Sequence, residues 1–319
     1  MTDHLFSTKA PPVPGEQKLY GHVYNGRYHM PRLPGDVPAK GCVPWEPGGL
    51  TRTTNLVGAF ADTRALNIWE QEQVLLGLTR DPLLYELLCK IVQDADRAGV
   101  NWLSLRDHPD VRQALTGSVQ DSKSCLVEMA KQAAGANEAR DAGTAQHEVW
   151  EERAASGRLT GTASQQRQAV MLENLLRENH LRRVPGLSER VIRNTEVDCA
   201  GRFDDVLQDE RTGECFMGDL KTKRRRFFTW QETDAQLAIY VRARYMLRRD
   251  GAGYEPGPLG RVNMERGIIL HAPSDGGQPF LRTADLVSGW DTALMARRIV
   301  DKRAYSKSAE RHALSVWVG

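Results

Sequence analysis

The sequence predicts an α/β fold in which a small mixed sheet of four strands is flanked by helices, with a further helical region toward the N-terminus. Apolar residues recur at helical spacing over much of 51–181, whereas short alternating segments separated by turn residues fill 190–220. The 319 residues are 40% hydrophobic and 26% charged, which is enough apolar surface to bury a core. Helices, three strands, a helix and a fourth strand follow one another, an order typical of a layered α/β domain.

The N-terminal part is expected to be an extension followed by helices. Residues 1–50 are rich in Pro, Gly and Tyr, lack helical or strand periodicity and predict an extended arm. A helix is expected to begin at Asp62 or Thr63, and a second at Asp81, where aspartate can cap the helix and the next residue is proline. Three more helical segments are expected at about 121–131, from Gly143 onward, and at 165–181.

After Pro185 and Gly186 the periodicity changes to that of strands. The expected strands are 190–198, 201–208, 214–220 and, after a helix at 230–249 and a loop at 250–261, 267–272. From about Thr283 the chain is expected to be helical and then to end in a charged tail. The expected domains are therefore the 1–50 extension, a main domain over 51–282 and a C-terminal helix and tail over 283–319.

Composition excludes several classes of protein. No apolar run approaches the roughly 20 residues of a membrane span, and no secretory signal pattern opens the chain, so a cytoplasmic protein is expected, in the host cytoplasm if a phage encodes it. The five cysteines are scattered without a CxxC pair, which argues against a disulfide framework or a zinc ribbon. The net charge of +2 argues against a protein that coats DNA non-specifically.

The segment 201–221 makes a geometric prediction. If the turn DERTG is centred between Arg211 and Thr212, paired residues have numbers summing to 423, so Asp204 lies opposite Asp219. Opposed side chains have Cβ atoms about 4.5–5.5 Å apart, and two like charges at that distance are destabilising. By strand alternation Lys221 shares the face of Asp219, whereas Asp205 is expected on the other face as a surface residue.

Two carboxylates tolerate this proximity when a divalent cation lies between them. A cation with an ammonium group alongside suits phosphodiester hydrolysis, because the cation activates water and the lysine offsets charge in the transition state. Taken alone, Asp204, Asp219 and Lys221 are also explained as ordinary charges on an exposed face of a sheet.

Four motifs in order favour the catalytic interpretation. They are GTAQH (143–147), GRFD (201–204), GDLK (218–221) and QLAIY (236–240). With them, the sequence resembles the PD-(D/E)XK nucleases, in particular the RecB-like exonuclease branch that includes CRISPR-associated and phage exonucleases. The similarity covers about residues 50–272, and the segment 50–70 is similar to the helical segment that often precedes the histidine motif in this branch.

The resemblance implies a restriction-endonuclease-like core and a role for each matching residue. Asp204, Asp219 and the main-chain carbonyl of Leu220 would bind the catalytic Mg²⁺ or Mn²⁺, with His147 assisting. Lys221 would be the catalytic lysine. Gln236 and Tyr240 would place the DNA backbone or the lysine.

Other residues are candidates for supporting roles. Glu196 is a candidate for an additional metal-binding or water-positioning carboxylate, with a charge at a strand edge as the alternative. Residues 219–249 hold nine basic and three acidic residues, which predicts a local cationic path for DNA that includes Arg224, Arg225 and Arg244. The aromatic residues Phe227, Phe228 and Trp230 are candidates for stacking on bases or for core packing.

The expected function is a metal-dependent DNA exonuclease that acts on ends or single strands in recombination, repair or phage DNA processing and leaves a 5′-phosphate. A structure-specific endonuclease and a non-catalytic nucleic-acid-binding protein with the same fold are the alternatives. The iron–sulfur members of the branch carry a cysteine cluster near the C-terminus, and no cysteine follows Cys215, so no iron–sulfur cluster is expected. No GxxxxGK[ST] loop occurs, so no helicase activity is expected. No surface for self-association can be assigned from the sequence.

Overall fold

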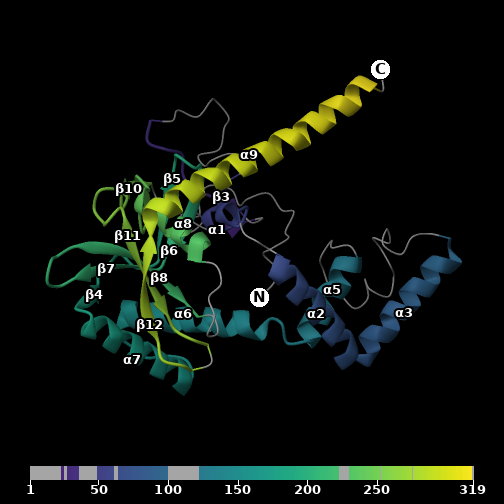
Figure 1. The fold of residues 1–319 in the computed structure, drawn as a ribbon, viewed down its shortest axis with the longest axis horizontal. Coiled ribbons are helices and arrows are strands. Elements are labelled where there is room, and N and C mark those ends of the chain that lie inside the picture. Colours follow the sequence, from purple (N-terminus) through teal and green to yellow (C-terminus); the bar gives the residue numbers. More distant parts are fainter. Residues whose placement is uncertain are drawn as a thin grey trace. The chain divides into compact units, whose positions relative to one another are not determined.

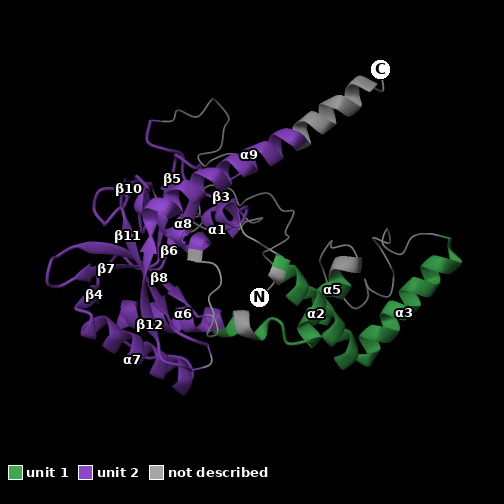
Figure 2. Ribbon diagram, in the orientation of Figure 1, with its two compact units in different colours: residues 1–8, 62–142 green, residues 9–61, 143–319 purple. Residues whose placement is uncertain are grey.

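The computed structural model describes residues 23–24, 27–35, 49–60, 64–99, 122–222, 230–251, 253–274 and 276–317. The chain forms two compact units, one over residues 1–8 and 62–142 and the other over 9–61 and 143–319 (Figure 2). Each unit has its own buried core.

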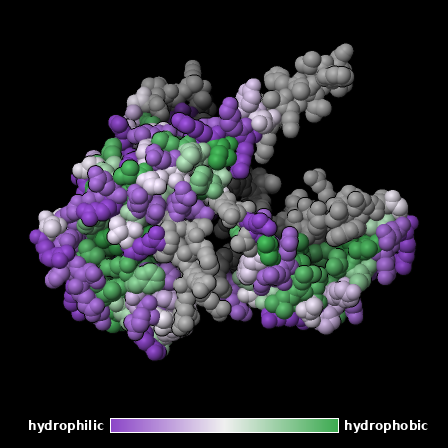
Figure 3. All heavy atoms as spheres, viewed as in Figure 1, coloured by the Kyte–Doolittle hydropathy of each residue, from purple (hydrophilic) through white to green (hydrophobic). Residues whose placement is uncertain are grey.

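Unit 1 (1–8 and 62–142) is helical where it is described. It contains α2 (Arg64–Arg80), α3 (Pro82–Arg97) and α5 (Ser122–Ala133). As expected, Asp81 caps α3, accepting a hydrogen bond from the backbone N–H of Leu84 at 3.1 Å. Its core is small, and apolar side chains such as Leu75 and Leu83 remain 66% and 76% exposed. Figure 3 shows hydrophobic atoms, in green, on the surface of this unit.

The described residues of unit 2 (9–61 and 143–319) form two mixed sheets. The seven-stranded sheet has the order β1-β2-β3-β6-β5-β9-β10, and the five-stranded sheet the order β12-β11-β8-β7-β4 (Figure 1). Their strands are β1 (Val23–Tyr24), β2 (Arg27–Tyr28), β3 (Leu50–Arg52), β4 (Leu181–Arg183), β5 (Arg190–Asn194), β6 (Cys199–Phe203), β7 (Asp205–Asp209), β8 (Cys215–Lys221), β9 (Tyr245–Leu247), β10 (Tyr254–Pro256), β11 (Arg266–His271) and β12 (Phe280–Asp285).

The α/β class is confirmed, but the expectation of one four-stranded sheet is wrong. The strand expected over 201–208 is interrupted at Asp204, which separates β6 from β7. Its first part therefore belongs to the seven-stranded sheet and its second part to the five-stranded sheet. The other strands that the sequence did not indicate have two to six residues, and several lie in the N-terminal extension or beside Gly and Pro. Periodicity over so few residues is too weak a signal.

In the part of unit 2 that the structure describes, five helices accompany the sheets, the first of them beginning in unit 1. They are α6 (Glu138–Ser156), α1 (Thr53–Val57), α7 (Ala163–Glu178), α8 (Trp230–Val241) and α9 (Leu286–Trp317). The helix expected from Gly143 begins five residues earlier, and that expected to end at Arg249 stops at Val241. The helix expected from Thr283 begins at Leu286, because 280–285 pair with β11. No described helix is long and apolar enough to cross a membrane.

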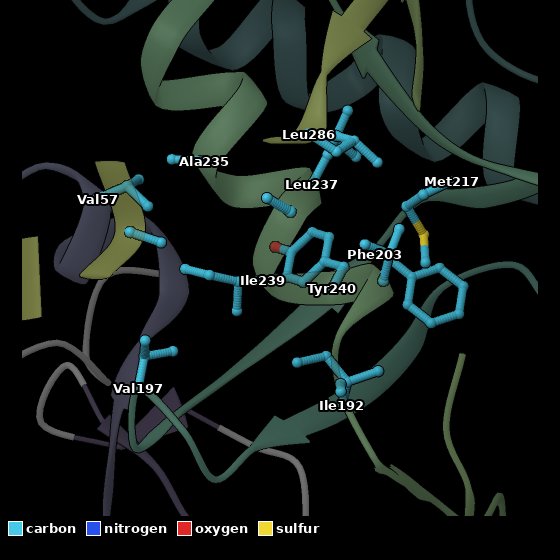
Figure 4. Close-up of a cluster of buried hydrophobic side chains, with 14 of the residues drawn as sticks. Val57, Ile192, Val197, Phe203, Met217, Ala235, Leu237, Ile239, Tyr240 and Leu286 are labelled. Atoms are coloured by element: carbon cyan, nitrogen blue, oxygen red, sulfur yellow. The ribbon is translucent and has the colours of Figure 1, made fainter. Parts of the chain in front are cut away.

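The helices cover both faces of the five-stranded sheet. Trp150 of α6 and Leu172 of α7 pack against Leu220 and Leu270 on one face. On the other face, α1, α8 and α9 form the larger core, in which Tyr240 lies beside Phe203 (Figure 4). At about 25 cal/mol per Å² of buried apolar surface, these two layers supply the main force that holds the hairpin of β7 and β8 in place.

Candidate active site

The hairpin of β7 and β8 brings two aspartates together. Asp205 pairs with Gly218 and Val206 with Met217, so the predicted register, with numbers summing to 423, is confirmed. The turn closes through hydrogen bonds from Asp209 N to Glu214 O and from Gly213 N to Asp209 O, each 2.8 Å. Asp204 lies one residue beyond the last pair, where the chain passes from one sheet to the other.

Asp204 is held against the neighbouring strand. The backbone N–H of Leu220 donates a hydrogen bond to Asp204 Oδ2 at 2.7 Å. Burial and then the charge of Asp219 raise the pKa of Asp204 well above its usual value, despite the opposing field of Lys221. The two carboxyl groups therefore lie close together, as the predicted register implies, and both are poorly solvated.

Lys221 supplies the compensating positive charge. Its Nζ lies 2.5 Å from Asp219 Oδ2, and the Asp219 side chain is only 2% exposed. Burial lowers the pKa of Lys221, but the charges of Asp219 and Asp204 outweigh it and the net shift is upward. The lysine is therefore an ammonium at neutral pH, next to both acids.

His147 faces this pair from helix α6. Its Nδ1 lies 3.7 Å from Asp204 Oδ2. Burial lowers the pKa of His147, although the charge of Asp219 acts in the opposite direction. A neutral imidazole, the form that binds metals, is therefore favoured at neutral pH.

A buried network around Asp205 sets the position of α6. The Asp205 carboxylate accepts hydrogen bonds from Trp150 Nε1 (2.8 Å), Arg183 Nε (2.8 Å) and Ser188 Oγ (2.6 Å). Arg183 also stacks on the Trp150 ring at 4.3 Å and donates to the Trp150 carbonyl oxygen at 2.9 Å. Since Trp150 lies three residues after His147, this network orients the helix that presents the histidine.

The expectation that Asp205 is a surface residue is wrong, since the residue is 1% exposed. Alternation placed it correctly on the face opposite Asp219, but that face is covered by α6. Whether a strand face meets solvent or a helix depends on contacts far apart in the sequence.

Gln236 and Tyr240 complete the site from α8. Gln236 Nε2 donates to Tyr240 Oη at 2.9 Å and lies 3.5 Å from Asp219 Oδ1. Tyr240 is buried, and its pKa is raised by burial and by the charge of Asp219. A Cβ on Gly201 would lie 2.4 Å from Thr53 Oγ1 and 2.7 Å from Tyr240 Cε1, so only glycine fits here in the GRFD segment.

Some predicted residues lie elsewhere. Because α8 ends at Val241, Arg244 does not extend the helical line of Gln236 and Tyr240, and it is exposed beyond the helix end. Glu196 lies in the exposed turn between β5 and β6, at the opposite end of β6 from Asp204.

The segment 223–229, with Arg224, Arg225, Phe227 and Phe228, lies outside the described residues. Trp230 begins α8, but its side chain is also outside them.

Two site neighbours had no recognised signal in the sequence. Glu189 donates a backbone hydrogen bond to Asp204 O at 2.9 Å, and its carboxylate pairs with Arg202 Nε at 2.8 Å. Burial raises the pKa of Glu189 to about 7, while the Arg202 guanidinium opposes the rise. Arg202 lies inside the GRFD motif, at a position to which the resemblance assigns no role.

The donor set determines which cation the site fits. In the described ranges, no three side chains of His, Cys, Asp or Glu form a ready-made metal group. Among the described residues, the buried Asp219 Oδ2 is contacted by the Lys221 ammonium, 2.5 Å away. One or two carboxylates with a main-chain carbonyl and water suit Mg²⁺ or Mn²⁺, which retain several waters. The residues present therefore fit such an ion.

Comparison finds no family model and no curated protein sequence that matches the chain. What the protein does must therefore follow from the chemistry of these side chains.

Proposed function

We propose that this protein is a Mg²⁺- or Mn²⁺-dependent deoxyribonuclease, of the PD-(D/E)XK type that its motifs resemble, acting as an exonuclease on DNA ends or single strands. The observation that carries the proposal is the arrangement of Asp204, Asp219 and Lys221. Two carboxyl groups lie close together in a poorly solvated position at an energetic cost, and the Lys221 ammonium lies 2.5 Å from Asp219 Oδ2.

Each side chain has a role in phosphodiester hydrolysis. A divalent cation bound here would polarise a phosphoryl oxygen and make bound water more acidic. Asp204, Asp219 and the carbonyl oxygen of Leu220 would hold that ion, and neutral His147 would assist. Lys221 is placed to offset negative charge that develops on the phosphate in the transition state.

The neighbours of the acids keep them in place. Gln236 orients Asp219 through Oδ1 and is itself held by Tyr240. The Leu220 N–H fixes the Oδ2 oxygen of Asp204. Prior ordering of these groups lowers the cost of reaching the transition state, since the protein need not reorganise during the reaction.

The test is cleavage of end-labelled linear DNA and of closed circular DNA with Mg²⁺, Mn²⁺ or chelator. We expect metal-dependent loss of the linear DNA and survival of the circle. Asp219→Asn and Lys221→Met should each lower the rate at least 100-fold. Asp301→Asn, which changes an exposed carboxylate on α9, is the matched control and should cleave like the wild type.

Cleavage of both substrates would replace the exonuclease assignment with an endonuclease. If neither substrate is cut with any metal, while Asp219→Asn still folds and binds DNA like the wild type, the protein is a binding module and the hydrolase proposal is wrong.

A further inference from the structure

One face of the seven-stranded sheet carries a pair of arginines beside the candidate active site. Arg52 is two residues after Leu50, and Arg202 is two residues after Ala200. Because side chains alternate along a strand, each arginine lies on the same face of the sheet as the residue two positions before it. Leu50 and Ala200 belong to one apolar cluster with Tyr28, and Arg52 pairs with Ala200 in the parallel ladder of β3 and β6. Arg52, Arg202 and Tyr28 therefore share one face.

This face leads to the catalytic acids. Asp204 lies two residues beyond Arg202, at the end of β6. Arg202 also lies close enough to His147 to lower the pKa of its imidazole, although burial and the charges of Asp219 and Lys221 have larger effects. Burial raises the pKa of Tyr28, and both Arg202 and Arg52 oppose that rise, so both guanidinium groups lie near this hydroxyl.

Arg202 is held in a defined position without being covered. Its Nε pairs with Glu189 Oε2 at 2.8 Å, and the Arg202 side chain is 53% exposed while that of Glu189 is 13% exposed. Glu189 is in turn fixed by its backbone hydrogen bond to Asp204 O. A guanidinium has five donors, so an ion pair through Nε is compatible with a further bidentate contact to an oxyanion.

We propose that Arg52 and Arg202, together with Tyr28, form a phosphate subsite that binds a second phosphate of the nucleic-acid strand next to the one at Asp204 and Asp219. The ligand is a phosphate oxyanion, either an internal phosphodiester or a terminal 5′-monoester. The choice of nucleic acid as its source rests on the proposed function. The subsite would hold the strand in register with the acids, a task that the sequence assigned to the arginines at 224, 225 and 244.

The test measures binding of the full chain to a fluorescent oligonucleotide in chelator, where no metal-dependent cleavage occurs. Anisotropy titrations over a range of salt concentrations give both Kd and the slope of log K against log[salt]. Arg202→Gln and Arg52→Gln should each weaken binding about 5- to 20-fold and reduce the magnitude of the slope by about 0.7–0.9. Arg211→Gln, an exposed arginine on the turn of the β7–β8 hairpin, is the matched control and should change neither quantity.

Oligonucleotides with and without a 5′-phosphate identify the source of the oxyanion. Equal weakening for both assigns the subsite to an internal phosphodiester. Weakening only for the phosphorylated strand assigns it to the terminal group.

The proposal is overturned if Arg202→Gln and Arg52→Gln bind with wild-type Kd and slope, or if the wild type binds no oligonucleotide. A lower melting temperature with unchanged binding would make Arg202 only a structural partner of Glu189. Wild-type binding that these variants weaken, with no cleavage in any metal, would leave the subsite standing and refute the hydrolase alone.

Discussion

Replacing Asp205 by asparagine measures how strongly the buried network fixes helix α6 beside the acids. Asp205 Oδ1 accepts from Arg183 and Ser188, and Oδ2 accepts from Trp150. Asparagine can keep the two bonds to Oδ1, but its NH₂ group then faces the Trp150 N–H. Two donors would be opposed in a position that is 1% exposed.

The expected cost follows from these contacts. A buried donor without a partner costs about 1–3 kcal/mol, and the loss of a charge-assisted bond to Arg183 costs a similar amount. Arg183 is 16% exposed, so its charge would be left nearly buried without a counter-ion. The sum is about 2–6 kcal/mol in the free energy of unfolding, or roughly 10 °C in melting temperature for a unit of this size.

Guanidinium unfolding followed by circular dichroism gives that free energy, and Trp fluorescence reports on the environment of Trp150. Asp301→Asn is the control, because it breaks an exposed ion pair to Arg297 and should cost less than about 1 kcal/mol. If Asp205→Asn unfolds within about 1 kcal/mol of the wild type, the network does not hold α6 and the reasoning fails.

Three further changes test other contacts. Gly201→Ala would force Thr53 and Tyr240 apart and should destabilise the fold by about 1–3 kcal/mol and slow cleavage; wild-type stability and rate would contradict this. Gly289→Ala would place a Cβ 2.4 Å from the backbone of Asp234 and should lower the melting temperature by several degrees, with calorimetry as the check. Burial raises the pKa of Asp234 to about 6, so its ionisation costs stability as pH rises from about 4 to 6. Because Asp234 is only partly buried, solvent screening reduces the effect, and Asp234→Asn should gain about 1–2 kcal/mol over the wild type at pH 8 and nothing below pH 4, measured by unfolding at both pH values.

The sequence predicted the parts of the site that depend on local geometry. The turn at 209–213 predicted the hairpin register, which the pairing of Asp205 with Gly218 confirms. The same register predicted Asp204 opposite Asp219; Asp204 lies one residue beyond the last pair, where its Oδ2 accepts a hydrogen bond from the Leu220 N–H. The four-residue spacing of Gln236 and Tyr240 placed them on one helical face, where their side chains are hydrogen-bonded. These predictions involve neighbours within about 20 residues, for which backbone geometry alone determines which side chains meet.

Errors arose where the answer depended on distant segments. Arg244 does not lie on the same helical face as Gln236, because α8 ends at Val241 and the chain continues into β9, which pairs with β5. The second sheet was missed because β3 and β9 are three-residue strands whose partners lie elsewhere in the chain. Such short segments form strands only when neighbouring strands offer the hydrogen bonds.

By itself, then, the sequence determined the α/β class, the cap at Asp81, the hairpin register and the pair of acids with their lysine, because each follows from dihedral preferences and side-chain periodicity over a few residues. The cap expected at Asp62 or Thr63 lies outside the described residues. Only the tertiary structure decided that Asp205 is buried under Trp150, and that Arg202 is held beside the acids by Glu189. Those facts depend on which helix covers a strand and which side chains lie across it. They are set by packing between residues up to 55 positions apart, as for Trp150 and Asp205, which local pattern does not encode.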